Sequence, residues 1–208
     1  MKPLDQAKSR LWTDMPTLQR QAVILMMMDR VVRSAIDAMG PESCRVVGGD
    51  PVVRQVAIAA GAVCMDDPGH DLNSSLWLSM LGAYDQGSLA TLFLPGDLPG
   101  VSAEDILTMV RASEEYTRPV GVRAANDGGT NALLVPARCV FAPLLGEDSF
   151  AKHSEVAERQ GAPLVALELP GLAVDVDTYD DLQWAKANVA GFTEKISDWQ
   201  SWLSERRV

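Results

Sequence analysis

Short apolar runs alternate with amphipathic segments along nearly the whole chain, and this alternation limits the possible folds. The expected strands lie at residues 44–48, 62–65, 89–94, 119–124, 131–135 and 163–168. The expected helices lie at residues 16–39, 51–60, 72–84, 102–113, 148–160 and 178–189. Strands separated by helices of this length form βαβ units, so we expect an α/β protein. Its sheet should be mainly parallel, with helices on both faces.

The size and charge of the chain exclude some classes of protein. A chain of 208 residues suits one core, so we expect a single domain over residues 1–208, with a helical tail at about 193–208. The net charge of −10 argues against nucleic-acid binding as the main purpose. No apolar stretch approaches 18 residues, and the start lacks a secretory signal, so we expect a cytoplasmic protein without a membrane span.

Two acidic segments follow expected strands. Asp97 comes shortly after the strand at 89–94, and Asp175 and Asp177 stand two positions apart in an extended segment, which places their side chains on one face. Ligands of parallel sheets bind beyond the carboxyl ends of the strands. We therefore expect these carboxylates to hold Mg²⁺ together with substrate phosphates. The plainer alternatives are that Asp97 is a turn residue and that Asp177 or Thr178 only caps the next helix.

Three cations lie just ahead of the first helix. Lys2, Lys8 and Arg10 could hold a polyphosphate and stabilise negative charge on a transferred group. A solvated basic surface is the alternative for such a short cluster.

Two glycine-containing turns are candidate anion sites. The first spans residues 126–131 and ends near Thr130, and the second leads from Gly146 into a helix near Ser149. An ordinary loop and an ordinary helix cap are the alternatives for each. His153 is expected on the helix surface or behind the site rather than as a catalytic base.

Together these segments resemble the 2-phospho-L-lactate guanylyltransferase family of coenzyme F-420 biosynthesis. Six motifs occur in family order: K-P-L-x-x-A-K-S-R-L at 2–11, D-L-N-S-S-L at 71–76, L-P-G-D-L-P at 94–99, N-D-G-G-T-N-A-L at 126–133, G-E-D-S-F-A-K-H at 146–153 and D-V-D-T-Y-D-D-L at 175–182. The resemblance implies a Rossmann-like nucleotidyltransferase fold, similar to that of molybdenum-cofactor guanylyltransferases. The family usually begins with an apolar strand before the K-P-L segment, and we expect that first strand to be missing here.

The resemblance also implies an activity and its residues. The phosphate of a small phospho-acid would attack the α-phosphate of GTP and release pyrophosphate. The implied roles are Mg²⁺ binding by Asp97, Asp175 and Asp177; phospho-acid binding by Thr130, Gly146 and Ser149; contact with the phosphates of GTP by Lys2, Lys8 and Arg10; and a place near the nucleoside for Asp71 and Asn73.

Several alternatives stay open from the sequence. The phospho-acid can be 2-phospho-L-lactate, phosphoenolpyruvate or 3-phospho-D-glycerate, which differ by small groups that only pocket shape separates. The acceptor can instead be a sugar phosphate or molybdopterin, and a non-catalytic nucleotide-binding module is a further alternative. Trp199 and Trp202 in the tail suit an apolar helix face that packs on the body or on a second copy, so a homodimer is expected as one possibility.

Overall fold

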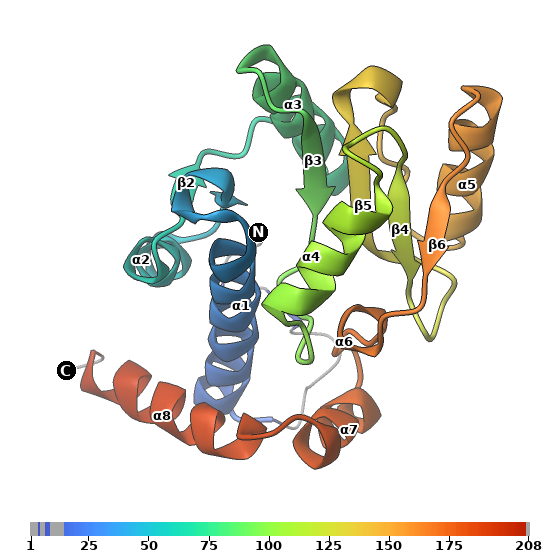
Figure 1. The fold of residues 1–208 in the computed structure, drawn as a ribbon. Coiled ribbons are helices and arrows are strands. Elements are labelled where there is room, and N and C mark those ends of the chain that lie inside the picture. The colour runs from blue at the N-terminus through green and yellow to red at the C-terminus, as the bar shows by residue number, and fades with distance from the viewer. Residues whose placement is uncertain (1–3, 5–6, 9–14, 207–208) are drawn as a thin grey trace. The chain divides into compact units, whose positions relative to one another are not determined.

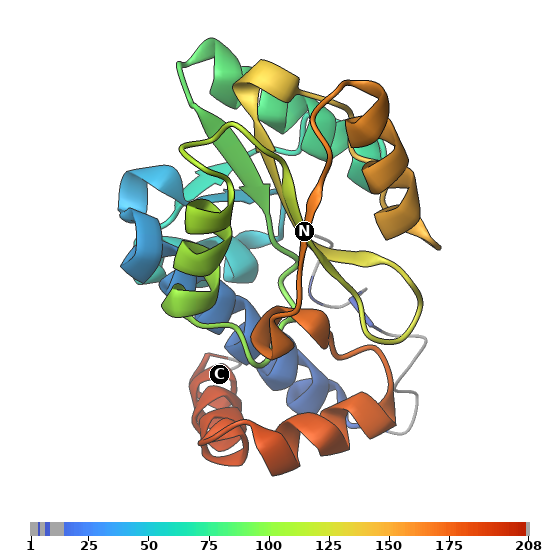
Figure 2. The same cartoon turned by 45° about the vertical axis from the view of Figure 1, so that its right-hand side comes forward.

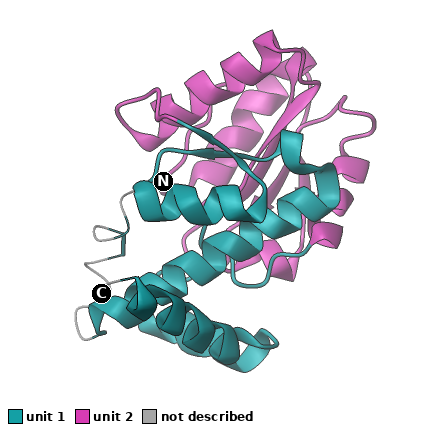
Figure 3. Ribbon diagram, turned by 90° about the vertical axis from the view of Figure 1, so that its left-hand side faces the viewer, with its two compact units in different colours: residues 1–65, 96–102, 175–208 teal, residues 66–95, 103–174 magenta. Residues whose placement is uncertain are grey.

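The computed structural model describes residues 4, 7–8 and 15–206. The chain forms two compact units, each assembled from segments that are distant in sequence (Figure 3). Unit 1 comprises residues 1–65, 96–102 and 175–208, and unit 2 comprises residues 66–95 and 103–174. Whether the whole chain behaves as the single expected domain stays a prediction.

Unit 1 is mainly helical (Figure 1). Its elements are α1 (Thr17–Met39), the 3₁₀ turn η1 (Pro41–Ser43), β1 (Arg45–Val47), α2 (Pro51–Ala60), β2 (Val63–Met65), α7 (Tyr179–Asn188) and α8 (Phe192–Glu205). The strands β1 and β2 pair in parallel and are joined through α2, which confirms one of the expected βαβ units. Asp50 is the N-cap of α2, because its carboxylate accepts hydrogen bonds from the backbone N–H groups of Val52 and Val53.

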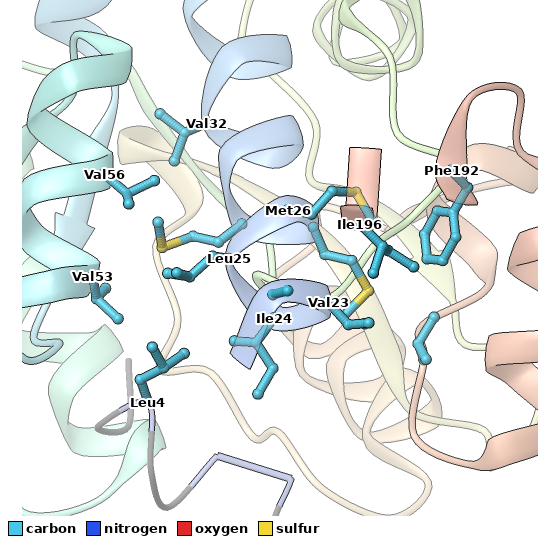
Figure 4. Packing of buried hydrophobic residues seen from close by; sticks show 14 of the residues in the cluster. Leu4, Val23, Ile24, Leu25, Met26, Val32, Val53, Val56, Phe192 and Ile196 are labelled. Atoms are coloured by element: carbon cyan, nitrogen blue, oxygen red, sulfur yellow. The ribbon is translucent and has the colours of Figure 1, made fainter. Parts of the chain in front are cut away.

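The core of unit 1 surrounds α1. Seven consecutive residues, 22–28, are buried on this helix, which requires neighbours on more than one side. The helices α2 and α8 both pack on α1, and the close view in Figure 4 shows Val53 and Val56 of α2 and Phe192 and Ile196 of α8 around it. Trp199 and Trp202 of α8 also pack against this core, so they no longer argue for a homodimer.

Unit 2 contains a four-stranded sheet in the order β3-β5-β4-β6. Its elements are α3 (Leu72–Asp85), β3 (Ala90–Phe93), α4 (Ala103–Ala112), β4 (Val120–Arg123), β5 (Thr130–Pro136), the 3₁₀ turn η2 (Ala137–Cys139), α5 (Ser149–Arg159), β6 (Val165–Leu167) and the short α6 (Pro170–Ala173). The expected helices and strands named above all have counterparts within one or two residues of their expected bounds.

Helices cover both faces of the unit 2 sheet, as expected (Figure 2). Leu133 and Val135 of β5 pack on one face in a cluster with residues of α3 and α5. The intervening Leu134 faces the other way because side chains alternate along a strand, and α4 lies on that side against β4.

The expectation of one mainly parallel sheet is wrong. The described strands form two sheets, and in unit 2 β5 runs antiparallel to both β3 and β4, while only β4 and β6 are parallel. The reason is the connection between β4 and β5, residues 124–129, which contains no helix. So short a connection makes a hairpin, whereas a parallel pair needs a long crossover. The strand expected to be missing would precede residue 4 and lies outside the described residues.

None of the helices in the described part of the chain is long and apolar enough to cross a membrane.

Replacing Leu25 by alanine should lower the free energy of unfolding by about 2–5 kcal/mol, because the fully buried side chain leaves a cavity at the centre of unit 1. Met39→Ala at the exposed end of the same helix is the matched control and should change it by less than about 1 kcal/mol. Urea unfolding of the three proteins measures both values. Equal losses for the two variants would contradict the assignment of α1 as the central helix of this core.

Candidate functional site: a carboxylate cluster and a hydroxyl cluster

Unit 1 brings the two acidic segments of the sequence together. The backbone N–H of Val176 donates to the carbonyl of Asp97 at 3.1 Å, which aligns the segments side by side. One carboxylate oxygen from each of Asp97, Asp175 and Asp177 lies within 4.8 Å of the others. Carboxylates this close repel one another by about 3 kcal/mol per pair at an effective dielectric constant near 20. The cluster therefore needs positive charge.

Lys8 supplies part of that charge. Its Nζ lies 2.8 Å from Oδ2 of Asp97 and 2.5 Å from Oδ1 of Asp177. Burial lowers the pKa of Lys8, but the charges and hydrogen bonds of the two aspartates outweigh this effect and leave the pKa above its usual value. The ammonium group is thus held protonated between two of the three carboxylates. Lys2 and Arg10, the other expected phosphate ligands, lie outside the described residues.

The cluster fits a hard divalent cation. Oδ1 of Asp97 is buried and has no hydrogen-bond partner among the described residues, so one ligand atom remains open beside the oxygens that Lys8 contacts. Magnesium prefers one or two protein carboxylates together with phosphates and water. The oxygens of this cluster are ligands of that kind.

The alternative role of Asp177 as a helix cap is not what the structure shows. Thr178 caps α7, and its hydroxyl accepts from the backbone N–H of Asp181 while the carboxylate of Asp181 accepts from the N–H of Thr178. This capping box satisfies the helix terminus without the Asp177 carboxylate. The side chain of Asp177 is therefore left for Lys8 and a cation.

Asp50 is a contributor that the sequence interpretation missed. Beyond capping α2, its Oδ2 accepts a hydrogen bond of 2.6 Å from the backbone N–H of Leu4, which is itself buried in the core of unit 1. The carboxylate therefore holds the beginning of the basic segment to α2. The only sequence signal was the N-cap position, which gives no hint of a second partner.

Unit 2 brings together a second cluster, built from Thr130, Ser149 and His153. Thr130 is the first residue of β5, and Ser149 and His153 lie one turn apart on the first half of α5. The hydroxyl of Ser149 donates to Oγ1 of Thr130 at 3.1 Å, and Nδ1 of His153 lies 3.0 Å from the same atom. The preceding glycine turn is joined to this cluster, because the carbonyl of Gly128 accepts from the backbone N–H of Phe150.

The loop before α5 is held by side chains. Asn73 accepts from the N–H of Leu145 and donates to its carbonyl, and Nε2 of His153 accepts from the N–H of Leu144 at 2.7 Å. Gly146 follows with φ of +127°, a conformation that favours glycine, and its carbonyl accepts from the N–H of Ser149. The three expected phospho-acid ligands, Thr130, Gly146 and Ser149, are therefore grouped in one part of unit 2.

Asp71 and Asn73 have structural roles near this loop. Asp71 caps α3, and the hydrogen bond from the backbone N–H of Ser74 lowers the pKa of its carboxyl group. Asn73 is occupied by Leu145. Their expected place beside a nucleoside stays a prediction.

His153 is fully buried, so its expected place on the helix surface is wrong, whereas a place behind the site agrees with its contact to Thr130. Loss of solvation lowers its pKa to about 4, with a smaller effect from the charge of Lys152. The ring is therefore neutral at physiological pH.

Comparison with solved structures identifies the class of fold. A putative nucleotide-diphospho-sugar transferase from Desulfovibrio desulfuricans superposes with a TM-score of 0.74 at 14% identity, covering 96% of this chain and 94% of that one. CMP:2-keto-3-deoxy-manno-octonic acid synthetase superposes with a TM-score of 0.53 at 13% identity, over 77% of this chain and 86% of that one. The chain thus has an α/β nucleotidyltransferase-like fold.

Comparison of sequences identifies the family. Residues 1–186 match the family model described as guanylyl transferase CofC like. The phosphoenolpyruvate guanylyltransferase of Roseiflexus castenholzii is 33% identical over 184 residues, covering 88% of this chain and 84% of the relative. The 3-phospho-D-glycerate guanylyltransferase of Phenylobacterium zucineum is 31% identical over 181 residues, covering 84% and 82%. This chain belongs to the CofC-like guanylyltransferase family, as the motifs indicated.

The burial of neutral His153 predicts a loss of stability in acid. In the unfolded chain this ring takes up a proton as the pH falls through about 6.5, whereas the folded chain resists protonation until about 4. The contribution of the ring is thus complete above pH 6.5 and falls by about 3 kcal/mol as the pH drops to 4. Urea unfolding at several pH values should show this loss in the wild type.

The histidine contribution is isolated by two variants. The loss of unfolding free energy in acid should be larger in wild type than in His153→Asn, because the variant lacks the buried ring. Some loss should remain in the variant, since carboxylates titrate in both proteins. His70→Asn, which replaces the exposed second histidine, should keep the wild-type profile. The same acid slope in wild type and His153→Asn would contradict a buried neutral ring.

Proposed function

We propose that this protein transfers the GMP group of GTP to a small phospho-acid and releases pyrophosphate, as a step of coenzyme F-420 biosynthesis. The observation that carries the proposal is the cluster of Asp97, Asp175 and Asp177 with Lys8 between two of its members. It stands in a chain of the CofC-like guanylyltransferase family. A group of this charge and geometry suits a cation–triphosphate complex.

The chemistry asks little of acid–base groups. The phosphate of the acid is already an anion at neutral pH, so it can attack the α-phosphate of GTP without a general base, and the bond from that phosphorus to the pyrophosphate oxygen breaks. A Mg²⁺ ion held by Asp97, Asp175 and Asp177 would neutralise charge on the phosphates. Lys8 would contact the same phosphates, and Lys2 and Arg10 of the same basic segment are proposed to do so too. Positioning of the two substrates and neutralisation of charge on the phosphates would then account for most of the rate enhancement.

Unit 2 is proposed to hold the phospho-acid. Thr130 and Ser149 belong to one hydrogen-bonded group, in which the hydroxyl of Ser149 donates to that of Thr130, and Gly146 precedes the helix on which Ser149 lies. Such a group of short side chains favours a compact anion over a sugar phosphate or molybdopterin. Asp71 and Asn73 are proposed to lie near the nucleoside, on the resemblance alone.

Phosphoenolpyruvate and 3-phospho-D-glycerate are the acceptors we propose first, because the relatives reported above are named for them. The acid of the family name, 2-phospho-L-lactate, is the third candidate.

Purified protein with GTP and Mg²⁺ should release pyrophosphate when one of the three acids is added. Asp177→Asn should lower turnover by at least about a hundredfold, because it removes a charge that holds the cation and Lys8. Asp180→Asn, three residues away on the exposed first turn of α7, is the matched control and should retain turnover within about twofold. A coupled pyrophosphate assay measures all three proteins.

The same assay separates an enzyme from a nucleotide-binding module. No release from the wild type with any of the three acids would contradict the proposed function. Release that is equal in wild type and Asp177→Asn would contradict the role of the carboxylate cluster.

A further inference from the structure

His153 is a buried titratable group that the proposed reaction does not use. Its side chain has no exposure, and both ring nitrogens have partners. Nε2 accepts from the backbone N–H of Leu144 at 2.7 Å, and Nδ1 lies 3.0 Å from Oγ1 of Thr130. The ring thus connects the loop before α5 to the first residue of β5.

These contacts determine where the ring proton lies. A backbone N–H can only donate, so Nε2 must carry a lone pair. A neutral imidazole has one N–H, which must then be on Nδ1 and must donate to Oγ1 of Thr130. The same oxygen also accepts from the hydroxyl of Ser149 at 3.1 Å.

A threonine oxygen has two lone pairs and one proton. With both lone pairs used by His153 and Ser149, the hydroxyl of Thr130 can act toward a ligand only as a donor. A tautomer with the proton on Nε2 would reverse this, because Nδ1 would then accept the proton of Thr130 and withdraw the donor.

The geometry points to His153 as a positioning residue that fixes Thr130 as a hydrogen-bond donor for an anionic acceptor substrate. This inference rests on the proposed function, since it names the residue that prepares the phospho-acid site. Ionised carboxylate and phosphate groups can accept hydrogen bonds but cannot donate them, so a fixed donor suits them. A neutral ligand group that must itself donate would find no acceptor on Thr130. His153 would thereby favour a fully ionised phospho-acid.

The first test is the tautomer itself, which needs no substitution in the site. The chain has two histidines, so ¹⁵N-histidine NMR of the intact protein gives two ring spectra, and His70→Asn identifies the exposed one. At pH 7 the ring of His153 should be neutral with its proton on Nδ1. A ring protonated on Nε2, or one that exchanges between tautomers, would overturn the inference whether or not the protein is active.

The second test uses two matched substitutions of His153. An asparagine places an N–H near the position of Nδ1, so it can still donate to Thr130 but cannot reach Leu144. A glutamine places its amide near the position of Nε2, so it can accept from Leu144 but not donate to Thr130. His153→Gln should raise KM for the phospho-acid about tenfold, whereas His153→Asn should raise it by less than about threefold. KM for GTP should stay within about twofold in both.

The outcomes separate the two claims. A wild type inactive with every acid contradicts the proposed function, while the NMR result still decides the tautomer. An active wild type whose KM for the acid is raised equally by Asn and Gln, or is unchanged by Gln, overturns the positioning role.

Discussion

The carboxylate cluster of unit 1 depends on one backbone hydrogen bond, from the N–H of Val176 to the carbonyl of Asp97, which aligns the two acidic segments. It joins segments nearly eighty residues apart. The side chains of the donor Val176 and of Leu98, which follows Asp97, are fully buried and attach both segments to the core of the unit. The bond keeps the backbone of the aspartates close together, and their carboxylates repel one another. Their charge must be met by a cation, either the ammonium of Lys8 or a metal ion.

The basic segment depends on the same unit for its position. The carboxylate of Asp50 accepts a hydrogen bond from the backbone N–H of Leu4, and the side chain of Leu4 lies in the core beside α1 and α2 (Figure 4). A lysine on a short segment anchored this way can reach Asp97 and Asp177 without ordering a long free loop, which would cost conformational entropy. The carboxylates, the ammonium group and the α2 cap thus form one connected arrangement.

Much of this could be predicted from the sequence because it rests on local rules. Helix caps at Asp50 and Thr178 follow from residue type and position, and Asp97 follows the strand β3, as expected. Asp175 and Asp177 follow the short helix α6 instead of the expected strand. The antiparallel β5 was missed because strand length and apolarity do not give direction; the short glycine turn at 124–129 was the signal for a hairpin. The contacts of His153 and of Asp50 with Leu4 join distant residues, and no local pattern encodes such pairings.

The roles of His153 in stability and in substrate binding have one cause. Complete burial makes the charged ring unfavourable. A neutral ring whose Nε2 accepts a hydrogen bond must carry its proton on Nδ1. The buried neutral ring makes the fold less stable in acid, and it keeps the hydroxyl of Thr130 as a hydrogen-bond donor.

The most direct test of the account is the affinity of the carboxylate cluster for a divalent cation, measured by Mn²⁺ electron paramagnetic resonance without nucleotide and confirmed by competition with Mg²⁺. Lys8→Gln removes the competing ammonium group and should tighten binding roughly tenfold, whereas Asp97→Asn should weaken it by at least as much. Arg33→Gln, at an exposed ion pair on α1, should leave it unchanged. Equal affinities in wild type, Lys8→Gln and Asp97→Asn would contradict the claim that these carboxylates form a cation site.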